Sequence, residues 1–416
     1  GMTIIVTDHH EVPYKENEAG RRYILPPADA VVDPRQEGCE YPFKGLCGAA
    51  VAYKLVEALC EANGQDVADL DYLLENVAIA TVADVMDLTE ENRILVKQGL
   101  EMLKRTSNLG LRALIQCIGL EGKKIQAYHI GFILAPCLNA SGKLDTAKRA
   151  LALLRAKTER EADMLAGDLK ALNESRRDMT DRVVDEAMAK VEQTDIRGDK
   201  VLVIYLPDCH ESLAGLVAGR VRENYYRPVF VLTDSEDGVK GSGRSIESYS
   251  MYEELTGCGD LLTKFGGHPM AAGLSLDKEN VEKFKRRLND QCTLSEEELT
   301  EKVVIDMELP FAAITEQFIE ELEYMEPFGK GNTKPVFAAR GVVMQHVKII
   351  GKNKNVAKAT AIDAAGNRME AICFHDAQEF AERCERNNGK MSITFYPGIN
   401  EFRGERQIQI VITHYR

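Results

Sequence analysis

Residues 4–11 read Ile-Ile-Val-Thr-Asp-His-His-Glu, a short apolar run that ends in a carboxylate and two imidazoles. A run of β-branched residues predicts a short buried strand. In open α/β sheets, ligands bind at the carboxyl ends of the strands, which is where Asp8, His9 and His10 would lie. Oxygen and imidazole ligands suit Mg²⁺, Mn²⁺ or Zn²⁺. Taken alone, the triplet fits a polar turn after a strand as well as it fits a metal site.

The remainder of the first 145 residues alternates apolar strand patterns with helical ones. A second strand is predicted at residues 31–34, and a helix rich in Gly and Ala begins near residue 45. Residues 77–88 repeat the opening design, and we expect an apolar strand that ends at Asp84, with Asp87 as a helix cap. The alternation predicts an α/β fold with a mainly parallel sheet.

Residues 146–192 contain no Pro and a single Gly, Gly167, and their apolar residues recur every third or fourth position. This pattern predicts one long amphipathic helix, about 70 Å long if unbroken, which would act as a spacer between domains. Asn173, Arg176 and Arg177 on this helix are candidates for a nucleic-acid channel. A solvated polar face is the simpler expectation for them.

A second α/β unit follows, with strands at residues 200–205 and 228–232 and a helix between them. Its chemical signal is two glycine motifs. Residues 241–245, Gly-Ser-Gly-Arg-Ser, combine backbone N–H donors with a guanidinium and suit a phosphate. Residues 265–273 add a glycine pair, an imidazole and the expected start of a helix, whose N-terminus attracts anions. Either motif alone is a weak signal, because glycine-rich loops are usually turns.

The last part of the chain changes to a β pattern. A helix at residues 316–324 is expected to stop before Pro-Phe-Gly-Lys-Gly-Asn at residues 327–332. Five strands and one helix then predict an OB-fold, a common binder of single strands. The expected strands are 336–350, 356–362, 368–374, 391–396 and 407–413, and the expected helix is 377–386. Phe402 and Arg403 are candidates for base stacking and phosphate contact; a structural hairpin loop is the alternative.

Charge and cysteine content narrow the class of protein. The 416 residues carry a net charge of −14, which argues against a uniform nucleic-acid-binding surface. Residues 331–416 contain 13 Lys/Arg against 8 Asp/Glu and are therefore at +5, which leaves −19 for the rest. Ten cysteines without a CxxC pair, and no signal peptide or membrane-length apolar run, predict a cytoplasmic protein with free thiols.

Several of these motifs, in this order, resemble one family. Asp8-His9-His10 is the signature of the DHH phosphoesterases, and its flanks resemble the RecJ branch of single-strand-specific 5′→3′ exonucleases. Asp84, followed by Glu91-Asn92-Arg93, resembles a later motif whose Asp binds metal. Residues 131–144 resemble a further family segment, with Cys137 and Lys143 where the family usually has Arg. The two glycine motifs resemble the DHHA1 domain.

The resemblance implies a role for each matched residue. His9 and Asp84 would be metal ligands, Asp8 would orient that site, and His10 would face the scissile phosphate. Phosphate and strand contacts would come from Asn139, Lys143, Ser242, Arg244, Gly266, Gly267 and His268, with Ser242 and Arg244 on the terminal 5′-phosphate.

The resemblance also implies a domain order and a function. The expected order is a partial DHH domain (1–145), a connecting helix (146–192), a DHHA1 domain with connecting helices (193–330) and an OB-fold (331–416). The implied activity is two-metal hydrolysis of 5′-phosphorylated single-stranded DNA with Mn²⁺ or Mg²⁺, in DNA repair and recombination. The implied partners are a single-strand-binding protein and a helicase, and we expect a monomer with no membrane association.

One departure from the family pattern bears on activity. The family's two earlier motifs, which supply further metal ligands, are absent from these 416 residues. We therefore expect the chain by itself to have little or no nuclease activity. Two other classes stay open at this point: a DHH-family oligonucleotide or small-molecule phosphatase, and a non-catalytic scaffold that binds single strands.

Overall fold

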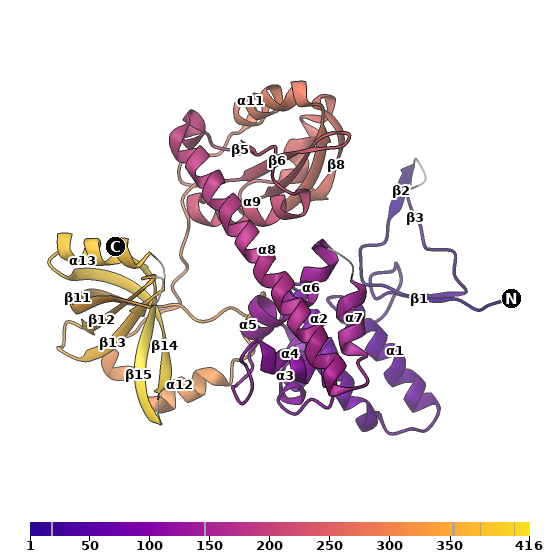
Figure 1. Cartoon of the computed structure of the whole chain (residues 1–416), viewed down its shortest axis with the longest axis horizontal. Helices are drawn as coiled ribbons and strands as arrows, with labels where there is room; N and C mark the ends of the chain where they lie inside the picture. Colours follow the sequence, from indigo (N-terminus) through magenta and orange to yellow (C-terminus); the bar gives the residue numbers. More distant parts are fainter. Residues whose placement is uncertain (18–19, 145–146, 352–353, 375, 403) are drawn as a thin grey trace. The chain divides into compact units, whose positions relative to one another are not determined.

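The computed structural model describes residues 1–17, 20–144, 147–351, 354–374, 376–402 and 404–416 (Figure 1). Internal contacts divide the chain into two compact units, each assembled from separate segments. The first unit contains Gly1–Ser107, Leu120–Ala135 and Val303–Arg416, and the second contains Asn108–Gly119 and Pro136–Lys302.

The first unit begins with two short strands that meet in parallel. Strand β1 (Ile5–Thr7) pairs with β4 (Ala30–Val32), with Ile5 opposite Ala30, which confirms the two predicted strands. The predicted burial of the first strand is wrong, because Ile5 is 56% exposed. Between them, β2 (Tyr14–Asn17) and β3 (Gly20–Tyr23) form an antiparallel hairpin. Helix α1 (Gly48–Ala62) follows, as the Gly/Ala pattern predicted. The carboxyl end of β1 is thus fixed by its pairing with β4.

The strand predicted at residues 77–88 is wrong, because this segment forms helix α2 (Leu74–Ala83). Helix α3 (Glu90–Leu103) packs closely on it, since a Cβ on Gly99 would lie 2.2 Å from the Leu74 carbonyl oxygen. An apolar run buried on all sides has neither the period of a half-buried strand nor that of a surface helix, so periodicity could not separate the two. Asp84 caps the end of α2 rather than a strand.

The single long helix predicted for residues 146–192 is divided in two. Helix α7 (Lys148–Leu154) ends before α8 (Glu159–Gln193), which has 35 residues and is about 50 Å long. The Thr158 hydroxyl accepts from the Glu161 N–H at 3.2 Å, and the Glu161 carboxylate accepts from the Lys157 N–H at 2.9 Å. Helix α8 therefore starts with a side-chain cap that an uninterrupted amphipathic pattern hides.

Residues 131–144, the segment that resembles the family around Cys137 and Lys143, are helical. Helix α5 (Ala127–His129), a π-helical turn (Ile130–Leu134) and α6 (Ala135–Leu144) follow each other directly. Helix α4 (Leu109–Cys117) packs against α8, and a Cβ on Gly110 would lie 2.0 Å from the Leu153 carbonyl oxygen.

The second unit contains a five-stranded sheet in the order β5-β6-β7-β9-β8. Only β5 and β6 are parallel, and the other neighbours are antiparallel. The strands are β5 (Leu202–Tyr205), β6 (Val229–Ser235), β7 (Gly238–Arg244), β8 (Leu262–His268) and β9 (Ala271–Leu276). The helices that follow α8 in this unit are α9 (Glu211–Tyr225), α10 (Met251–Thr256) and α11 (Val281–Gln291).

Both glycine motifs of this unit lie in strands. Residues 241–244 belong to β7, and residues 265–273 form the β8–β9 hairpin, so the helix start predicted there is wrong. The glycines of β7 serve close packing: a Cβ on Gly243 would lie 2.6 Å from Phe230 Cε1. The small residues 271–273, expected to begin a helix, instead belong to β9, which lies between β7 and β8 in the sheet.

The predicted C-terminal barrel is confirmed (Figure 1). Strand β11 pairs with both β12 and β14, which closes the sheet β11-β12-β13-β15-β14, and the short β10 is added beside β11. Phe337, Phe395 and Phe380 lie in its core. Its strands are β10 (Met307–Glu308), β11 (Phe337–Ile350), β12 (Val356–Ile362), β13 (Arg368–Cys373), β14 (Lys390–Phe402) and β15 (Glu405–Tyr415). Helix α12 (Glu316–Glu323) precedes the barrel and α13 (Ala377–Arg386) connects β13 to β14.

Two further properties concern the whole chain. All ten cysteines are free thiols. Among the residues that the structure describes, no helix is both long and apolar enough to span a membrane.

Candidate metal and nucleic-acid sites

Asp8 organises the turn that follows β1. Its backbone N–H donates to the Val32 carbonyl at 3.0 Å, which extends the pairing with β4 by one residue. Its Oδ1 accepts from the backbone N–H of His9 at 2.7 Å and lies 2.7 Å from His10 Nδ1. The His10 hydrogen bond is the main reason that the pKa of Asp8 falls to about 2, and the same bond raises the pKa of His10. Asp8 is therefore ionised, and its carboxylate stabilises the loop of residues 8–10 through these hydrogen bonds.

His9 faces a different partner. Its Nε2 lies 3.6 Å from Asp84 Oδ2, and its side chain is 18% exposed. Gly48 at the start of α1 allows this position, because a Cβ there would lie 3.3 Å from His9 Cδ2. The structure thus brings together His9 and Asp84 from two distant segments, although one of those segments is a helix and not the strand that was predicted.

The donor set at this edge fits a divalent cation. Ligand atoms of Asp8, His9 and His10 lie within 4.8 Å of one another. The separation of His9 Nε2 and Asp84 Oδ2, 3.6 Å, is too long for a direct hydrogen bond. One imidazole and one carboxylate are borderline and hard ligands, and both are suited to Mn²⁺ or Mg²⁺ sites.

In the second unit, Ser242 and Arg244 project from β7 beside helix α9. Gly215 on α9 permits their approach, because a Cβ there would lie 2.7 Å from Arg244 Nη2 and 3.3 Å from Ser242 Oγ. Arg244 donates to the Gly243 carbonyl at 2.8 Å, and none of the described carboxylates pairs with it. Burial, with Arg222 nearby, lowers the pKa of Arg244. A half-buried guanidinium without a counter-ion is suited to bind an anion.

A cleft of about 510 Å³ opens beside these strands. Ser242 and Gly266 line it, whereas Arg244, Gly267 and His268 are not among its lining residues. The prediction missed Lys240, Lys264 and Ser275, which do line it. The signal for Lys240 was available, because a strand at residues 238–244 places alternate residues on one face.

The glycine pair of the β8–β9 hairpin has two different environments. Gly267 has φ +149°, and a Cβ there would lie 2.4 Å from the Ala271 carbonyl oxygen, so the hairpin requires glycine at this position. A Cβ on Gly266 would meet no atom within 4 Å. His268 is exposed at the end of β8. Gly267 therefore has a structural reason to be glycine, while Gly266 leaves space open beside the cleft.

Of the three polar candidates on α8, only Arg177 lies on a solvated face as expected, and the other two do not. Asn173 and Arg176 are buried, and Arg177 is exposed. Arg176 Nη2 donates to Asn173 Oδ1 at 2.8 Å, and Asn173 Nδ2 lies 3.5 Å from the buried Cys137 Sγ. Burial lowers the pKa of Arg176.

The remaining predicted contacts are only partly described. Asn139 is exposed on α6. The side chain of Lys143, the side chain of Phe402 and the whole of Arg403 lie outside the described residues.

Two family models match the chain, the DHHA1 domain over residues 198–294 and the RecJ OB domain over residues 305–414. The chain is 37% identical to the single-stranded-DNA-specific exonuclease RecJ of Bacillus subtilis (strain 168), over 99% of the chain and 50% of that protein. It is 33% identical to the RecJ of Salmonella typhimurium, over 99% of the chain and 73% of that protein. The chain thus spans half the length of the Bacillus relative.

Solved structures agree with these matches. The structure of RecJ from Thermus thermophilus in complex with Mn²⁺ superimposes with a TM-score of 0.80 at 27% identity, over 100% of this chain and 58% of that one. A structure of the same protein with Mg²⁺ matches with a TM-score of 0.75 at 26% identity, over 91% of this chain and 57% of that one.

Proposed function

The chain belongs to the RecJ family of single-stranded-DNA-specific exonucleases, and we propose that it forms part of a 5′→3′ exonuclease that hydrolyses single-stranded DNA with divalent metal ions. The observation that carries this proposal is the approach of His9 Nε2 to Asp84 Oδ2 at 3.6 Å. RecJ of Thermus thermophilus was solved in complex with Mn²⁺ and with Mg²⁺, and either ion suits this donor pair.

The residues around the metal edge have separate tasks in this proposal. His9 and Asp84 hold the metal, which when bound activates water and stabilises the leaving oxygen. Asp8 fixes the loop through its bonds to the His9 N–H and the His10 ring. His10 is exposed and its pKa is raised by Asp8, so its ring can donate a proton to a phosphate oxygen.

The 5′ end of the strand is proposed to bind in the second unit. Arg244 has no carboxylate partner among the described residues. Ser242 lines the adjacent cleft with Lys264 and with Lys240, which pairs with Glu211 at 2.7 Å. A terminal phosphate supplies the two negative charges that such a group of donors attracts. Gly266, Gly267, His268, Asn139 and Lys143 remain proposed strand contacts.

The barrel is proposed to bind the following nucleotides, because residues 331–416 carry a net charge of +5 in a protein of −14. We retain the domain order 1–145, 146–192, 193–330 and 331–416, a role in DNA repair and recombination, and a cytoplasmic location as parts of the same proposal. A single-strand-binding protein and a helicase are the partners that it implies.

Binding of 5′-phosphorylated and 5′-hydroxyl oligodeoxynucleotides tests the proposal directly. Wild-type protein should prefer the phosphorylated strand, and Arg244→Gln should remove most of that preference while binding of the hydroxyl strand is kept. Arg222→Gln, a neighbouring arginine with a carboxylate partner, is the matched control. Equal binding of both strands by the wild type would refute the phosphate site.

Catalysis has its own test. Two protein ligands rarely hold Mn²⁺ or Mg²⁺ tightly, so we propose that these 416 residues alone cleave 5′-phosphorylated single strands weakly or not at all. Metal-dependent digestion by the isolated chain, lost in Asp84→Asn, would contradict this and would show a complete site.

A further inference from the structure

The segment of residues 323–332, here called the connector, joins α12 to the barrel, and its glycines have no role in the proposed function. Gly329 and Gly331 both face the loop of residues 84–89, which carries Asp84. A Cβ on Gly329 would lie 2.7 Å from Leu88 Cδ1, and Leu88 is only 2% exposed. Gly331 has φ +74°, and a Cβ there would lie 2.9 Å from Asp87 Cβ. Both contacts leave no room for a side chain.

Polar contacts reinforce this packing. The Leu88 N–H donates to the Lys330 carbonyl at 2.7 Å. Lys330 Nζ also lies 3.1 Å from Asp87 Oδ1. The backbone of the loop is therefore hydrogen-bonded to the connector only a few residues after Asp84.

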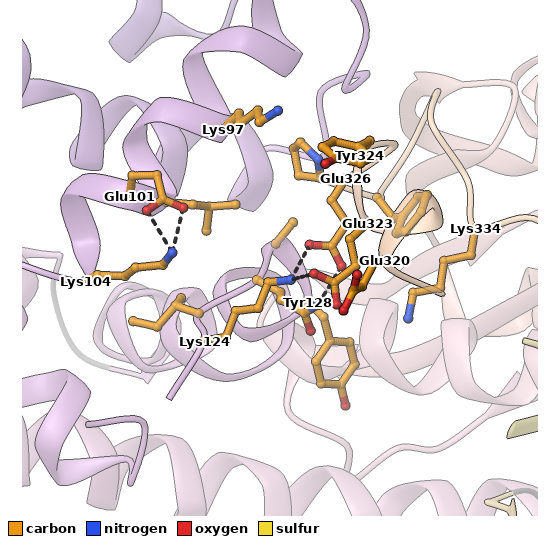
Figure 2. A pocket seen from close by; sticks show the side chains of 16 residues that line it. Lys97, Glu101, Lys104, Lys124, Tyr128, Glu320, Glu323, Tyr324, Glu326 and Lys334 are labelled. Atoms are coloured by element: carbon orange, nitrogen blue, oxygen red, sulfur yellow. Dashed lines mark hydrogen bonds and ion pairs between the residues drawn. The ribbon is translucent and has the colours of Figure 1, made fainter. Parts of the chain in front are cut away.

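The connector is itself held at its other end (Figure 2). Arg93 on α3 donates to the Tyr324 carbonyl at 2.8 Å. Lys124 pairs with Glu323 at 2.8 Å and with Glu326 at 3.2 Å, and these three side chains meet at a pocket of about 430 Å³. Gln126 Nε2 donates to Glu326 Oε1 at 2.8 Å. The connector is thus fixed at both ends and cannot move without breaking several contacts.

The loop that the connector holds is strained at the residue after Asp84. Helix α2 ends with the Val85 N–H donating to Val82 and the Met86 N–H donating to Thr81, a pattern that places Val85 at φ +55°. This position normally takes glycine, and a β-branched residue there is a true outlier. Such strain persists only where the surrounding structure holds it in place.

From these contacts we infer that the connector is a positioning element for Asp84, which keeps the carboxylate opposite His9 by bracing the strained loop that follows it. The inference rests on the proposed metal role of Asp84. It adds that the segment leading into the barrel determines the geometry of one metal ligand.

Gly331→Ala tests the inference, with Gly366→Ala as the matched control, since Gly366 also has a positive φ of +87° but a Cβ there would meet no atom within 4 Å. Two quantities are measured on the full chain: hydrogen exchange of residues 84–89 without metal, and Mn²⁺ affinity by electron paramagnetic resonance. Gly331→Ala should speed exchange in the loop by about tenfold, the low end for a clash in a packed site, and weaken Mn²⁺ binding. Gly366→Ala should change neither.

A rescue pair guards against a general folding defect. Gly329→Ala should show the same two effects, and Leu88→Ala combined with it should reverse them in part, because the smaller side chain makes room for the new methyl group. If Gly331→Ala and Gly329→Ala behave like the control, the inference is overturned. Asp84→Asn tests the metal role of Asp84 separately. If this variant binds Mn²⁺ as tightly as the wild type, Asp84 is not a metal ligand. The inference then fails as well, even if the glycine variants change hydrogen exchange in the loop.

Discussion

Arg176 on α8 is a buried cation that pairs with no carboxylate of the described residues, and substitutions around it should separate two opposing effects. Its side chain is 9% exposed, and Nη2 donates to Asn173 Oδ1 at 2.8 Å. Its Nε has no hydrogen-bond partner, and none of the described carboxylates forms an ion pair with it. Each buried polar atom that loses its partner should therefore change stability measurably.

The expected magnitudes follow from the number of unpaired atoms that each variant leaves. Asn173→Leu removes the acceptor of the guanidinium and should destabilise the second unit by about 1–3 kcal/mol. Arg176→Met removes the unpartnered Nε, which raises the free energy of unfolding, but it leaves Asn173 Oδ1 without a donor, which lowers it. The two changes should nearly cancel. The double variant leaves neither group and should be more stable than the wild type by about 1–3 kcal/mol.

Native-state hydrogen exchange of α8 measures these differences locally, which avoids treating a chain of several domains as a two-state system. Arg177→Met, at the exposed neighbouring position, should stay within about 0.5 kcal/mol of the wild type. A double variant as unstable as Asn173→Leu would refute the reasoning, because it would show that the guanidinium stabilises the fold by itself.

Because burial of the Arg176 guanidinium without a carboxylate partner among the described residues is expected to destabilise the fold, a bound anion would explain why this charge is present. If Arg176 pairs with a strand phosphate, Arg176→Met should weaken binding of single-stranded DNA and reduce the slope of log K against log salt by about 0.7. An unchanged slope would remove Arg176 from the binding surface and leave its burial unexplained by the substrate.

Three further predictions test the local physics of the fold. Gly267→Ala should destabilise the β8–β9 hairpin by about 1–3 kcal/mol, whereas Gly266→Ala should not, as measured by exchange of the hairpin amides. Burial raises the pKa of Glu75 above its usual 4.5, because the folded protein favours the neutral carboxyl. The contribution of Glu75 to stability is therefore fully present below pH 4.5 and falls as the pH rises through the pKa of Glu75 in the folded state. The unfolding midpoint of Glu75→Gln should therefore rise relative to that of the wild type as the pH increases above 4.5. A difference that does not change with pH would contradict the raised pKa. Val85→Gly should stabilise the end of α2 by about 1 kcal/mol, since relief of a left-handed β-branched residue outweighs the added chain entropy; a loss of protection there would show that Val85 is not strained.

The barrel was predictable because each of its signals is local. Alternating side chains mark the strands at residues 356–362 and 368–373, and the helix at residues 377–386 begins and ends where the sequence pattern does. The final hairpin is longer than predicted, since β14 and β15 continue to Phe402 and from Glu405. Their outer ends lack the apolar alternation of the core, so pairing rather than burial defines them.

Contacts between distant segments could not be predicted in the same way. Nothing in the sequence near Arg244 indicates that Gly215 on α9 must be small to admit its guanidinium. The break before α8 depends on the Thr158 hydroxyl, which accepts from the Glu161 N–H, and on the Glu161 carboxylate, which accepts from the Lys157 N–H. The spacing of Thr158 and Glu161 is visible in the sequence but is easily overlooked inside a continuous amphipathic pattern.

The runs that precede Asp8 and Asp84 show why a site can be easier to predict than the element that carries it. Both are apolar and end in a carboxylate, yet one forms a strand and the other a helix. The run in α2 is buried, whereas Ile4 and Ile5 before Asp8 are 47% and 56% exposed, so burial does not explain both segments. What they share is that the first carboxylate follows directly after the apolar element, and this position can be read from the sequence in either conformation. The 3.6 Å approach of Asp84 to His9 depends on the packing of the two segments, which the sequence pattern does not contain.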